Sequence, residues 1–318
     1  MKLSVSFTGF LIAAGLLGCL ATLAGFVGGF WWGFELATHF RVQYALVLGG
    51  FALILLALRP WRWPALFGAF ALLNLSLIAP AYLDADPAGP AADSQPPLRA
   101  LLANVNAGNR DHERLRRLIA ASDPDVIVLL EATPWLLAQL SDLGERYPHL
   151  AAEPRDDLFG IALFSRHPLA RSQIVRFGGK AGPPSIVATV TAGVRMFTLI
   201  GTHPWPPGSA ELAEGRNDQL RALAILARQI QPPLLVLGDL NVSPWSPWFA
   251  HLLADSGLRD SRRGRGLQPS WPTGWPPLWI PIDHVLFSED IRIRHREIGP
   301  AIGSDHYPVI VDFQVSGS

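Results

Sequence analysis

The sequence predicts three transmembrane helices followed by one α/β domain. Only five of the 52 charged residues lie among the first 83 of the 318 positions, so the character of the chain changes sharply after that point. Beyond it, short β-rich runs alternate with helical runs, which is the pattern of an α/β fold. A content of 49% apolar residues excludes a disordered or fibrous chain. We therefore expect a membrane domain over 1–83, a linker over 84–97 and a globular domain over 98–318.

The first 83 residues contain three uncharged stretches that are long enough to cross a membrane as helices. Spanning the hydrocarbon core takes roughly 17 to 25 residues, and residues 3–34, 42–58 and 63–83 meet this requirement. The middle stretch lies at the minimum length, so a re-entrant or buried hairpin is the alternative there. Cys19, the single cysteine, follows a faint lipoprotein-like signal, but the apolar run continues past it and favours an uncleaved helix.

Basic residues in the short loops predict the orientation of these helices. Lys2 precedes the first span, Arg59 and Arg62 lie between the second and the third, and only Arg41 lies in the other loop. Lys and Arg are enriched on the cytoplasmic side of membrane proteins. We therefore expect a multi-pass protein of the inner or cell membrane with a cytoplasmic N-terminus. The globular domain would then lie on the periplasmic or extracellular side.

The linker and the elements after it are read from composition and periodicity. Residues 84–97 hold four prolines among Asp, Ala, Gly and Ser, a composition that neither buries a core nor sustains a helix. Strands are predicted at Leu98–Val105, Asp125–Glu131, Phe159–Phe164, Ser185–Thr191, Met196–Thr202, Leu234–Gly238, Asp283–Phe287 and Val309–Val315. Helices are predicted at about 111–121, 133–143, 210–229 and 246–256, the second and fourth of them beginning with an N-cap followed by proline.

Acidic, amide and histidine side chains stand where the predicted strands end. A single strand-terminal Asp or Asn is usually a turn former or a helix cap, but six such segments in one domain indicate a shared cleft. A carboxylate directly after the apolar run VIVLL is costly to bury unless it is paired or holds a metal. The residues at the strand ends are Asn104, Asn106, Glu131, His203, Asp239, Asn241, Asp283, Asp305 and His306.

The types of these residues fit one another chemically. Carboxylates and amide carbonyls suit a hard cation such as Mg²⁺ or Mn²⁺, whereas zinc would more often recruit Cys or several His. Two histidines beside carboxylates supply proton transfer and phosphate contacts near neutral pH. The sequence contains no Ser-centred elbow or phosphate-cradling glycine loop. The set therefore favours metal-assisted hydrolysis of a phosphate ester.

The same segments resemble the endonuclease/exonuclease/phosphatase superfamily, whose fold is that of deoxyribonuclease I. The segments NVN, LE, TH, GDLN, IDH and SDHYP occur here in the family's order between residues 98 and 315. The resemblance implies a four-layer α/β/β/α sandwich. It also implies that Glu131 is the main divalent-metal ligand and that Asn104 and Asp305 complete or support the metal site.

The resemblance further implies the roles of five catalytic residues. Asp239, steadied by Asn241, would orient and activate the attacking water. His306, held by Asp283, would contact the scissile phosphate, and His203 would protonate the leaving group or stabilise the phosphorane oxygens. The roles of the two histidines could also be exchanged or shared.

The sequence departs from the family pattern at two places beside this set. Pro281 stands before Ile282-Asp283, where the family commonly has Arg, and Pro204 follows Thr202-His203 in place of the usual Leu. Because the metal and nucleophile residues are intact, we expect these changes to affect the substrate rather than the reaction. His284, next to Asp283, is interpreted as a packing residue.

Tryptophans in the loops around the predicted site bear on the substrate. They either pack irregular loops or form an apolar rim that faces the bilayer, because indole rings prefer the interface. Three spans joined to this domain also resemble the membrane-anchored branch of the superfamily that contains a bacterial teicoplanin-resistance phosphatase. That resemblance implies a lipid-linked substrate such as undecaprenyl pyrophosphate. The tryptophans are Trp205, Trp245, Trp248, Trp271, Trp275 and Trp279.

Two alternatives stay open for the function. A membrane-tethered nuclease fits the same catalytic set and the basic cluster Arg262-Arg263-Arg265, although 22 Lys and Arg against 25 Asp and Glu make the globular part slightly acidic. Such a cluster is more often a solvated loop. A non-catalytic scaffold would require losses in the catalytic set, and none is found. Three further polar residues lie on the helix after the His203 loop and could face the cleft, although a surface or capping role is favoured for them. They are Arg216, Asn217 and Gln219.

Overall fold

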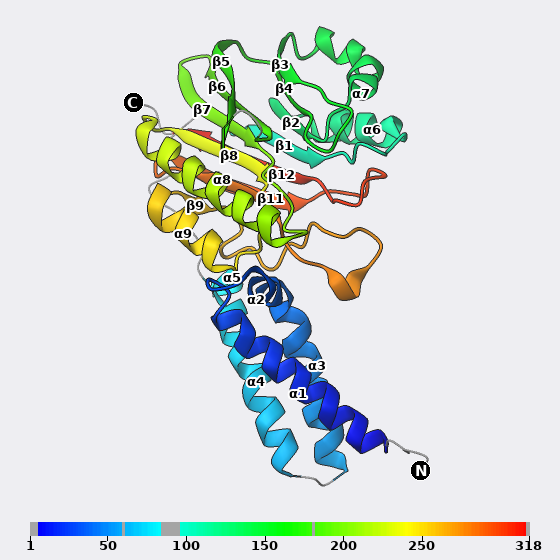
Figure 1. Ribbon diagram of the computed structural model, residues 1–318. Coiled ribbons are helices and arrows are strands. Elements are labelled where there is room, and N and C mark those ends of the chain that lie inside the picture. The colour runs from blue at the N-terminus through cyan, green and yellow to red at the C-terminus, as the bar shows by residue number, and fades with distance from the viewer. Residues whose placement is uncertain (1–5, 59–60, 84–95, 180–181, 316–318) are drawn as a thin grey trace.

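The structure, a computed structural model, describes residues 6–58, 61–83, 96–179 and 182–315. It places an α/β domain on one end of a bundle of long apolar helices (Figure 1). Three segments of the bundle, Phe7–Phe26, Trp32–Ala57 and Arg62–Leu83, are long and apolar enough to cross a membrane, which confirms the predicted three helices and suggests membrane anchoring. The bundle consists of α1 (Phe7–Phe26), α2 (Trp32–Leu36), the 3₁₀ turn η1 (Ala37–Phe40), α3 (Arg41–Ala57), α4 (Arg62–Ile78) and α5 (Pro80–Leu83).

Arg41 differs from its predicted place in a loop between the first two spans. It is the first residue of α3 and is buried between helices, where its guanidinium donates to the carbonyl oxygen of Thr22 at 2.9 Å and lies 3.4 Å from Oδ1 of Asn74. Gly25 makes room for it, because a Cβ atom there would collide with the guanidinium. Arg41 is therefore a packing residue of the bundle, which removes it from the loop count used to predict orientation.

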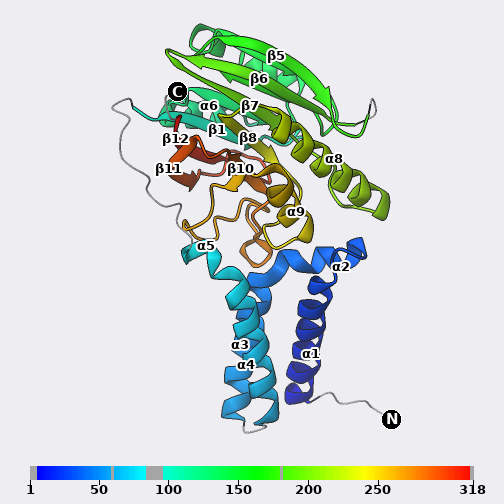
Figure 2. The same ribbon diagram turned by 90° about the vertical axis from the view of Figure 1, so that its left-hand side faces the viewer.

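The alternative of a re-entrant or buried hairpin for the middle stretch is not what the structure shows, because α3 runs along the length of α4 (Figure 2). The start of α1, the end of α3 and the start of α4 lie at the end of the bundle away from the α/β domain (Figure 1). Lys2, Arg59 and most of the predicted linker, residues 84–95, lie outside the described residues. The orientation and the domain boundaries therefore stay predictions.

The α/β domain consists of two six-stranded mixed sheets. Their strand orders are β11-β12-β1-β2-β4-β3 and β5-β6-β7-β8-β10-β9, with β1 parallel to β2 and β7 parallel to β8. The first sheet contains β1 (Leu98–Asn104), β2 (Val126–Leu130), β3 (His149–Glu153), β4 (Ile161–Ser165), β11 (Ile291–Ile298) and β12 (Val309–Val315). The second contains β5 (Leu169–Arg176), β6 (Pro184–Ala192), β7 (Arg195–Thr202), β8 (Leu234–Asp239), β9 (Arg259–Asp260) and β10 (Asp283–Phe287).

Three apolar cores hold four layers together, which confirms the predicted α/β/β/α sandwich. The inner faces of the two sheets share one core, where Phe197 meets Phe313 with ring centroids 5.3 Å apart. A second core lies between the first sheet and its helices, and a third between the second sheet and its helices. These helices are α6 (His112–Ser122), α7 (Pro134–Gln139) with the 3₁₀ turn η2 (Ser141–Glu145), α8 (Ala210–Gln229) and α9 (Pro247–Ser256).

Four strands were not predicted: β3, β5, β9 and β11. The side chains of β5 are largely exposed along its length, so it lacks the apolar alternation of a half-buried strand. In β11 the sequence IRIRHREI contains three arginines, and a bulge between Ile293 and His295 breaks the alternation further. The predicted helix at 133–143 is shorter than expected, because α7 ends at Gln139 and a 3₁₀ turn follows.

Candidate active site

The ends of the central strands bring the predicted site residues together. Asn104 ends β1, Glu131 follows β2 and Asp239 ends β8, while Asp283 begins β10 directly opposite Asp239 in the antiparallel register. Parallel neighbours end at the same edge of a sheet, so the tips of β1 and β2 meet. Because the two sheets are stacked, these tips also meet those of the second sheet.

Asn104 joins the two sheets at this edge. Its side-chain amide donates to Oε1 of Glu131 at 3.0 Å and to Oδ2 of Asp239 at 3.2 Å. The other oxygen of Glu131 accepts the backbone N–H of Ala107 at 3.0 Å. All three side chains are buried. The contact brings two carboxylates from different sheets onto one amide group.

At these strand tips the backbone adopts positive φ angles, which residues other than glycine rarely adopt. Glu131, Asn106 and Asn241 have φ values of 58°, 58° and 52°, in the left-handed region. Asn tolerates this region, but Glu does so rarely, and such residues cluster at functional sites. The bend after β2 therefore turns the Glu131 carboxylate toward Asn104 at an energetic cost that the surrounding contacts must offset.

Asp239 lies between two imidazoles. Nε2 of His203 is 3.4 Å and Nε2 of His306 is 3.5 Å from Oδ2 of Asp239. The other nitrogen of His306, Nδ1, is 2.8 Å from Oδ2 of Asp283. In the described part of the chain, Asp239, Asp283 and His306 form the one group of acidic or histidine side chains whose ligand atoms lie within 4.8 Å of one another. The arrangement makes an alternating chain of carboxylates and imidazoles.

Burial and mutual attraction act in opposite directions on these groups. Burial alone lowers the pKa of His306 and His203, but the carboxylates of Asp283 and Asp239 outweigh it at His306, and that of Asp239 outweighs it at His203. Both histidine pKa values are therefore raised. Burial also tends to raise the pKa of Asp239, yet the two imidazoles lower it overall. The pKa of Asp283 is raised, because burial and the charge of Asp239 exceed the effect of His306. The site therefore favours charged imidazoles around an ionised Asp239.

The residues of this site fit a divalent metal ion. Among the described residues, the buried carboxylate of Glu131 is bonded by the neutral donors Asn104 and Ala107, and Oδ1 of the buried Asp283 has no hydrogen-bond partner. A buried carboxylate without a cationic partner is unfavourable, so a hard cation beside Glu131 would remove that cost.

Of the three predicted metal ligands, Asp305 is the most exposed to solvent. It is exposed, and its carboxylate accepts from the Asn106 amide at 2.7 Å and from the indole N–H of Trp271 at 3.1 Å. The structure thus joins Asn104 and Glu131 directly and connects Asp305 to the same site through the loop after β1. The role of these three residues as metal ligands stays a prediction.

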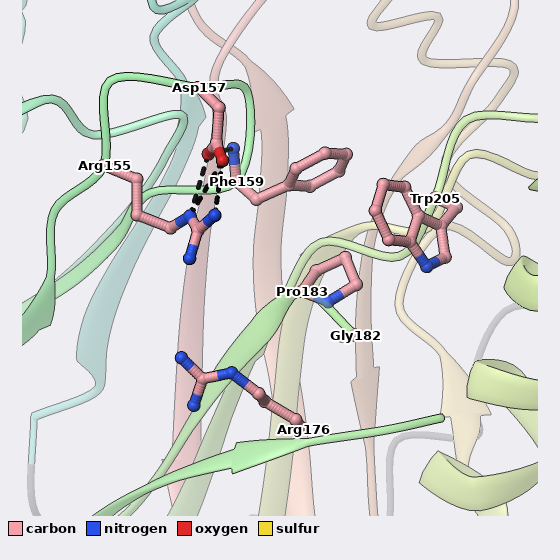
Figure 3. A pocket seen from close by; sticks show the side chains of 7 residues that line it. All are labelled: Arg155, Asp157, Phe159, Arg176, Gly182, Pro183 and Trp205. Atoms are coloured by element: carbon pink, nitrogen blue, oxygen red, sulfur yellow. Dashed lines mark hydrogen bonds and ion pairs between the residues drawn. The ribbon is translucent and has the colours of Figure 1, made fainter. Parts of the chain in front are cut away.

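A pocket of about 700 Å³ adjoins His203 and was not predicted from the sequence. The ring of Phe159 lies 5.6 Å from the His203 ring and 4.5 Å from the Trp205 ring, between centroids. Figure 3 shows Phe159 and Trp205 with two arginines of the pocket, Arg155 and Arg176. Arg176 belongs to β5, and Arg155 follows β3. Because both strands were missed, no sequence signal placed these residues beside the site.

The surface or capping role favoured for Arg216, Asn217 and Gln219 of α8 is wrong, because these three residues are buried. Arg216 donates to the backbone carbonyl of Asn241 at 2.5 Å, and Asn241 in turn donates from its side chain to the carbonyl of Pro204 at 3.0 Å. Gln219 accepts the backbone N–H of Trp205 at 2.9 Å. Helix α8 therefore braces the two loops that carry Asp239 and His203. The buried residues are Arg216, Asn217 and Gln219.

Arg216 also connects the site to the bundle. Its guanidinium pairs with Oε2 of Glu35 in α2 at 2.5 Å, and Oε1 of Glu35 accepts the hydroxyl of Ser246 at 2.7 Å. A second contact joins Nδ1 of His39 to the hydroxyl oxygen of Ser243 at 2.8 Å. Figure 2 shows α2 lying across the end of the bundle below α8 and α9. The α/β domain is thus docked on the helices by buried polar contacts.

Two further predictions concern residues beside β10. Arg262 is buried, lies 3.5 Å from Asp260 and stacks over the ring of Trp245, so the basic cluster is not a uniformly solvated loop. His284 packs as expected, with its ring centroid 4.4 Å from that of Phe249 and Nε2 2.8 Å from the carbonyl oxygen of Val242.

Comparison with known proteins gives a consistent assignment. The chain matches the Endonuclease/Exonuclease/phosphatase family over residues 101–306, and no curated protein matches it. Its fold is similar to the endonuclease/exonuclease/phosphatase from Beutenbergia cavernae, with a TM-score of 0.55, 22% identity and coverage of 70% of this chain and 72% of that one.

Two other solved structures share the fold. The 3′ phosphatase NExo from Neisseria, bound to a product DNA hairpin, has a TM-score of 0.58, 20% identity and coverage of 68% of this chain and 99% of that one. Sphingomyelinase C from Streptomyces griseocarneus has a TM-score of 0.50, 21% identity and coverage of 69% and 99%. With the family match extending over more than half of its length, the chain belongs to the endonuclease/exonuclease/phosphatase family.

Proposed function

We propose that this protein is a membrane-anchored, divalent-metal-dependent phosphoesterase that hydrolyses a lipid-linked phosphate ester or pyrophosphate, such as undecaprenyl pyrophosphate. Members of its family are hydrolases of phosphate esters and are generally dependent on divalent metals. One observation carries the proposal. The α/β domain that contains His203, Asp239 and His306 is held by buried contacts against helices that are long and apolar enough to cross a membrane. In this proposal residues 1–83 form the membrane domain, 84–97 the linker and 98–318 the catalytic domain, on the periplasmic or extracellular side.

The metal ion, Mg²⁺ or Mn²⁺, would be held by Glu131 with Asn104 and Asp305. When bound, it supplies charge that stabilises the developing negative oxygens of the phosphoryl group and lowers the pKa of a coordinated water. Asn104 bonds to both Glu131 and Asp239, so it sets the distance between the metal residue and the catalytic carboxylate.

Asp239 would orient and activate the attacking water. Its Oδ1 already accepts the backbone N–H of Asn241 at 3.0 Å, which fixes the carboxylate and leaves Oδ2 facing the imidazoles. His306, held by Asp283, would donate to a phosphate oxygen from Nε2. His203 would protonate the leaving oxygen. The carboxylates of Asp283 and Asp239 raise the pKa of His306 to about 10, which keeps its imidazole protonated near neutral pH, and the pKa of His203 is raised by Asp239, which favours its proton-donating form.

A membrane-tethered nuclease is the second candidate. The pocket beside His203 combines the aromatic rings of Phe159 and Trp205 with Arg155 and Arg176, which suits a stacked base and a phosphate. The Neisseria relative is described with a DNA hairpin. The burial of Arg262 weakens the basic cluster that pointed to nucleic acid, so we favour the lipid substrate.

One experiment separates these functions. The full chain, purified in detergent, is assayed with Mg²⁺ for phosphate release from undecaprenyl pyrophosphate, for headgroup release from sphingomyelin and for cleavage of plasmid DNA. We expect release from undecaprenyl pyrophosphate, abolished by Glu131→Ala and by His306→Ala. Glu289→Ala, at an exposed carboxylate between β10 and β11, is the matched control and should keep full activity. Cleavage of DNA alone with the same dependence would establish the nuclease instead. Failure with every substrate by a folded protein that binds no divalent ion would favour a scaffold.

A further inference from the structure

A second, smaller cavity lies between helix α3 and the α/β domain. Its volume is about 190 Å³. Val42, Gln43 and Leu46 of α3 form one wall, and Trp245 with the loop of residues 267–281 forms the other. We call it the α3 pocket. The side chains of its walls are mostly apolar. The amide nitrogen of Gln43 donates to the carbonyl oxygen of Trp279 at 2.9 Å, whereas Oε1 of Gln43 and the indole N–H of Trp279 have no hydrogen-bond partner among the described residues.

The α3 wall of this pocket continues into a surface that would face lipid. Val42 and Leu46 belong to the candidate span Trp32–Ala57, and Leu46 is 71% exposed. Leu53 is 72% exposed and lies seven residues further, on the same face of the helix. A hydrocarbon chain lying along this face in a bilayer would therefore pass from Leu53 to Leu46 and reach the pocket without crossing a polar surface.

The opposite wall is bonded to the catalytic segment. The backbone N–H of Thr273 donates to the carbonyl of Asp305 at 2.8 Å, and that of Tyr307 donates to the carbonyl of Ser270 at 2.7 Å. The ring of Trp279, which lines the pocket, meets the ring of Tyr307 with centroids 6.1 Å apart. One loop thus has the pocket on one side and the residues flanking His306 on the other.

We infer that the α3 pocket binds the part of the hydrocarbon chain next to the phosphate group of the lipid substrate, an inference that rests on the proposed function. We assign a hydrocarbon chain as the ligand because the walls of the pocket are mostly apolar and one of them is a candidate membrane helix. Its size suits a short stretch of chain, with the remainder in the bilayer along α3. The chain would thereby hold the phosphate group near Asp305 and His306.

The first test compares substrates of different chain length. Leu46→Trp fills the pocket from α3, and Pro277→Phe fills it from the exposed side of the loop, so a folding defect in one wall would not be shared by the other. Leu17→Trp adds the same bulk at an exposed position of α1, a helix that contributes no residue to the pocket. In the wild type and in Leu17→Trp, kcat/KM for polyprenyl pyrophosphates should rise with chain length. In both pocket variants KM for the long chain should rise about tenfold, because burial of a few methylene groups is lost, while the shortest substrate is hydrolysed as by the wild type.

The second test does not depend on activity. The full chain in detergent is irradiated with a polyprenyl monophosphate that carries a diazirine in the isoprene unit next to the phosphate, and labelled peptides are mapped by mass spectrometry. We expect labels within residues 42–46 and 267–281, reduced several-fold by Leu46→Trp and by Pro277→Phe but not by Leu17→Trp.

The two tests distinguish the failure of this inference from that of the proposed function. Labelling of the pocket without hydrolysis of any lipid pyrophosphate would refute the function and leave the binding site standing. Hydrolysis in which both pocket variants match Leu17→Trp, with labels located elsewhere, would overturn the site and leave the function standing.

Discussion

Glu35 and Arg216 form an ion pair in which neither side chain is exposed, although one belongs to the helical bundle and the other to the α/β domain. The same guanidinium holds the carbonyl of Asn241, two residues after Asp239. The bundle is therefore connected to the loop after Asp239 through this arginine, in addition to the contact of His39 with Ser243.

Neutralising Glu35 should impair both docking and catalysis. Glu35→Gln leaves the buried Arg216 without a counter-charge, which typically costs about 3–5 kcal/mol, and frees the guanidinium to shift the Asn241 loop. We expect a lower unfolding temperature and a lower kcat with a smaller change in KM. Glu214→Gln, at an exposed carboxylate of the same helix α8, is the control. The double variant Glu35→Gln/Arg216→Met should recover part of the stability, because it removes both charges. Equal stability of Glu35→Gln and wild type would refute this coupling.

Glu131 should decide whether a divalent ion stabilises the protein. Excess Mg²⁺ or Mn²⁺ should raise the unfolding temperature of the wild type, and an ion at a hundred times its Kd should raise the free energy of unfolding by about 2.7 kcal/mol. Glu131→Gln should abolish this response. Without metal the variant should be somewhat less stable than the wild type, because its single amide oxygen can accept from only one of the two donors, Asn104 and the Ala107 N–H, that the carboxylate oxygens now satisfy. Thermal unfolding with and without the ion, and after chelation, measures both effects. An undiminished metal response in Glu131→Gln would place the ion elsewhere.

His306 and its partner Asp283 should contribute unequally to catalysis. His306→Gln removes the donor to the phosphate and should lower kcat by roughly 10²–10⁴-fold. Asp283→Asn should lower kcat less, because its amide oxygen still accepts from Nδ1 of His306 and Asp239 remains 3.5 Å from Nε2. Steady-state kinetics on the substrate that the wild type hydrolyses best gives the comparison. Equal losses in the two variants would show that the charge of Asp283 matters as much as the imidazole.

His284 should make the stability depend on pH. Burial lowers the pKa of its imidazole from the ordinary value of 6.5 to about 4, an effect that Asp260 and the Val242 carbonyl only partly oppose. Because the folded state disfavours the charged form, its contribution is complete above about pH 6.5 and is lost as the pH falls toward 4, on the order of 3 kcal/mol in total. Unfolding temperatures at pH 7.5 and 5 should therefore differ less in His284→Gln than in the wild type. Parallel pH profiles of the two proteins would contradict this.

Short sequence patterns were sufficient to predict the central strands and the residues at their ends. Apolar runs such as VIVLL and LLVLG identified the central strands, and the polar residues after them identified the site, because an apolar strand and the polar residues that end it differ in composition over a few residues. Edge strands such as β5 were missed because exposed side chains carry no apolar periodicity.

Long-range pairing explains the remaining errors. Arg216 on an amphipathic helix is typical of a solvated face, and its burial depends on distant partners, Glu35, 181 positions away, and the carbonyl of Asn241. Arg41 was placed in a loop for the same reason, since its partners Thr22 and Asn74 lie on two other helices. Charge inside a protein depends on partners that the neighbouring sequence does not reveal.

The seating of α2 beneath α8 has a geometric consequence. A catalytic centre fastened in this way to helices that cross a bilayer cannot rise or tilt freely, so its reach above the headgroups is fixed. The enzyme would then select among phosphorylated lipids by the distance of the scissile bond from the membrane surface.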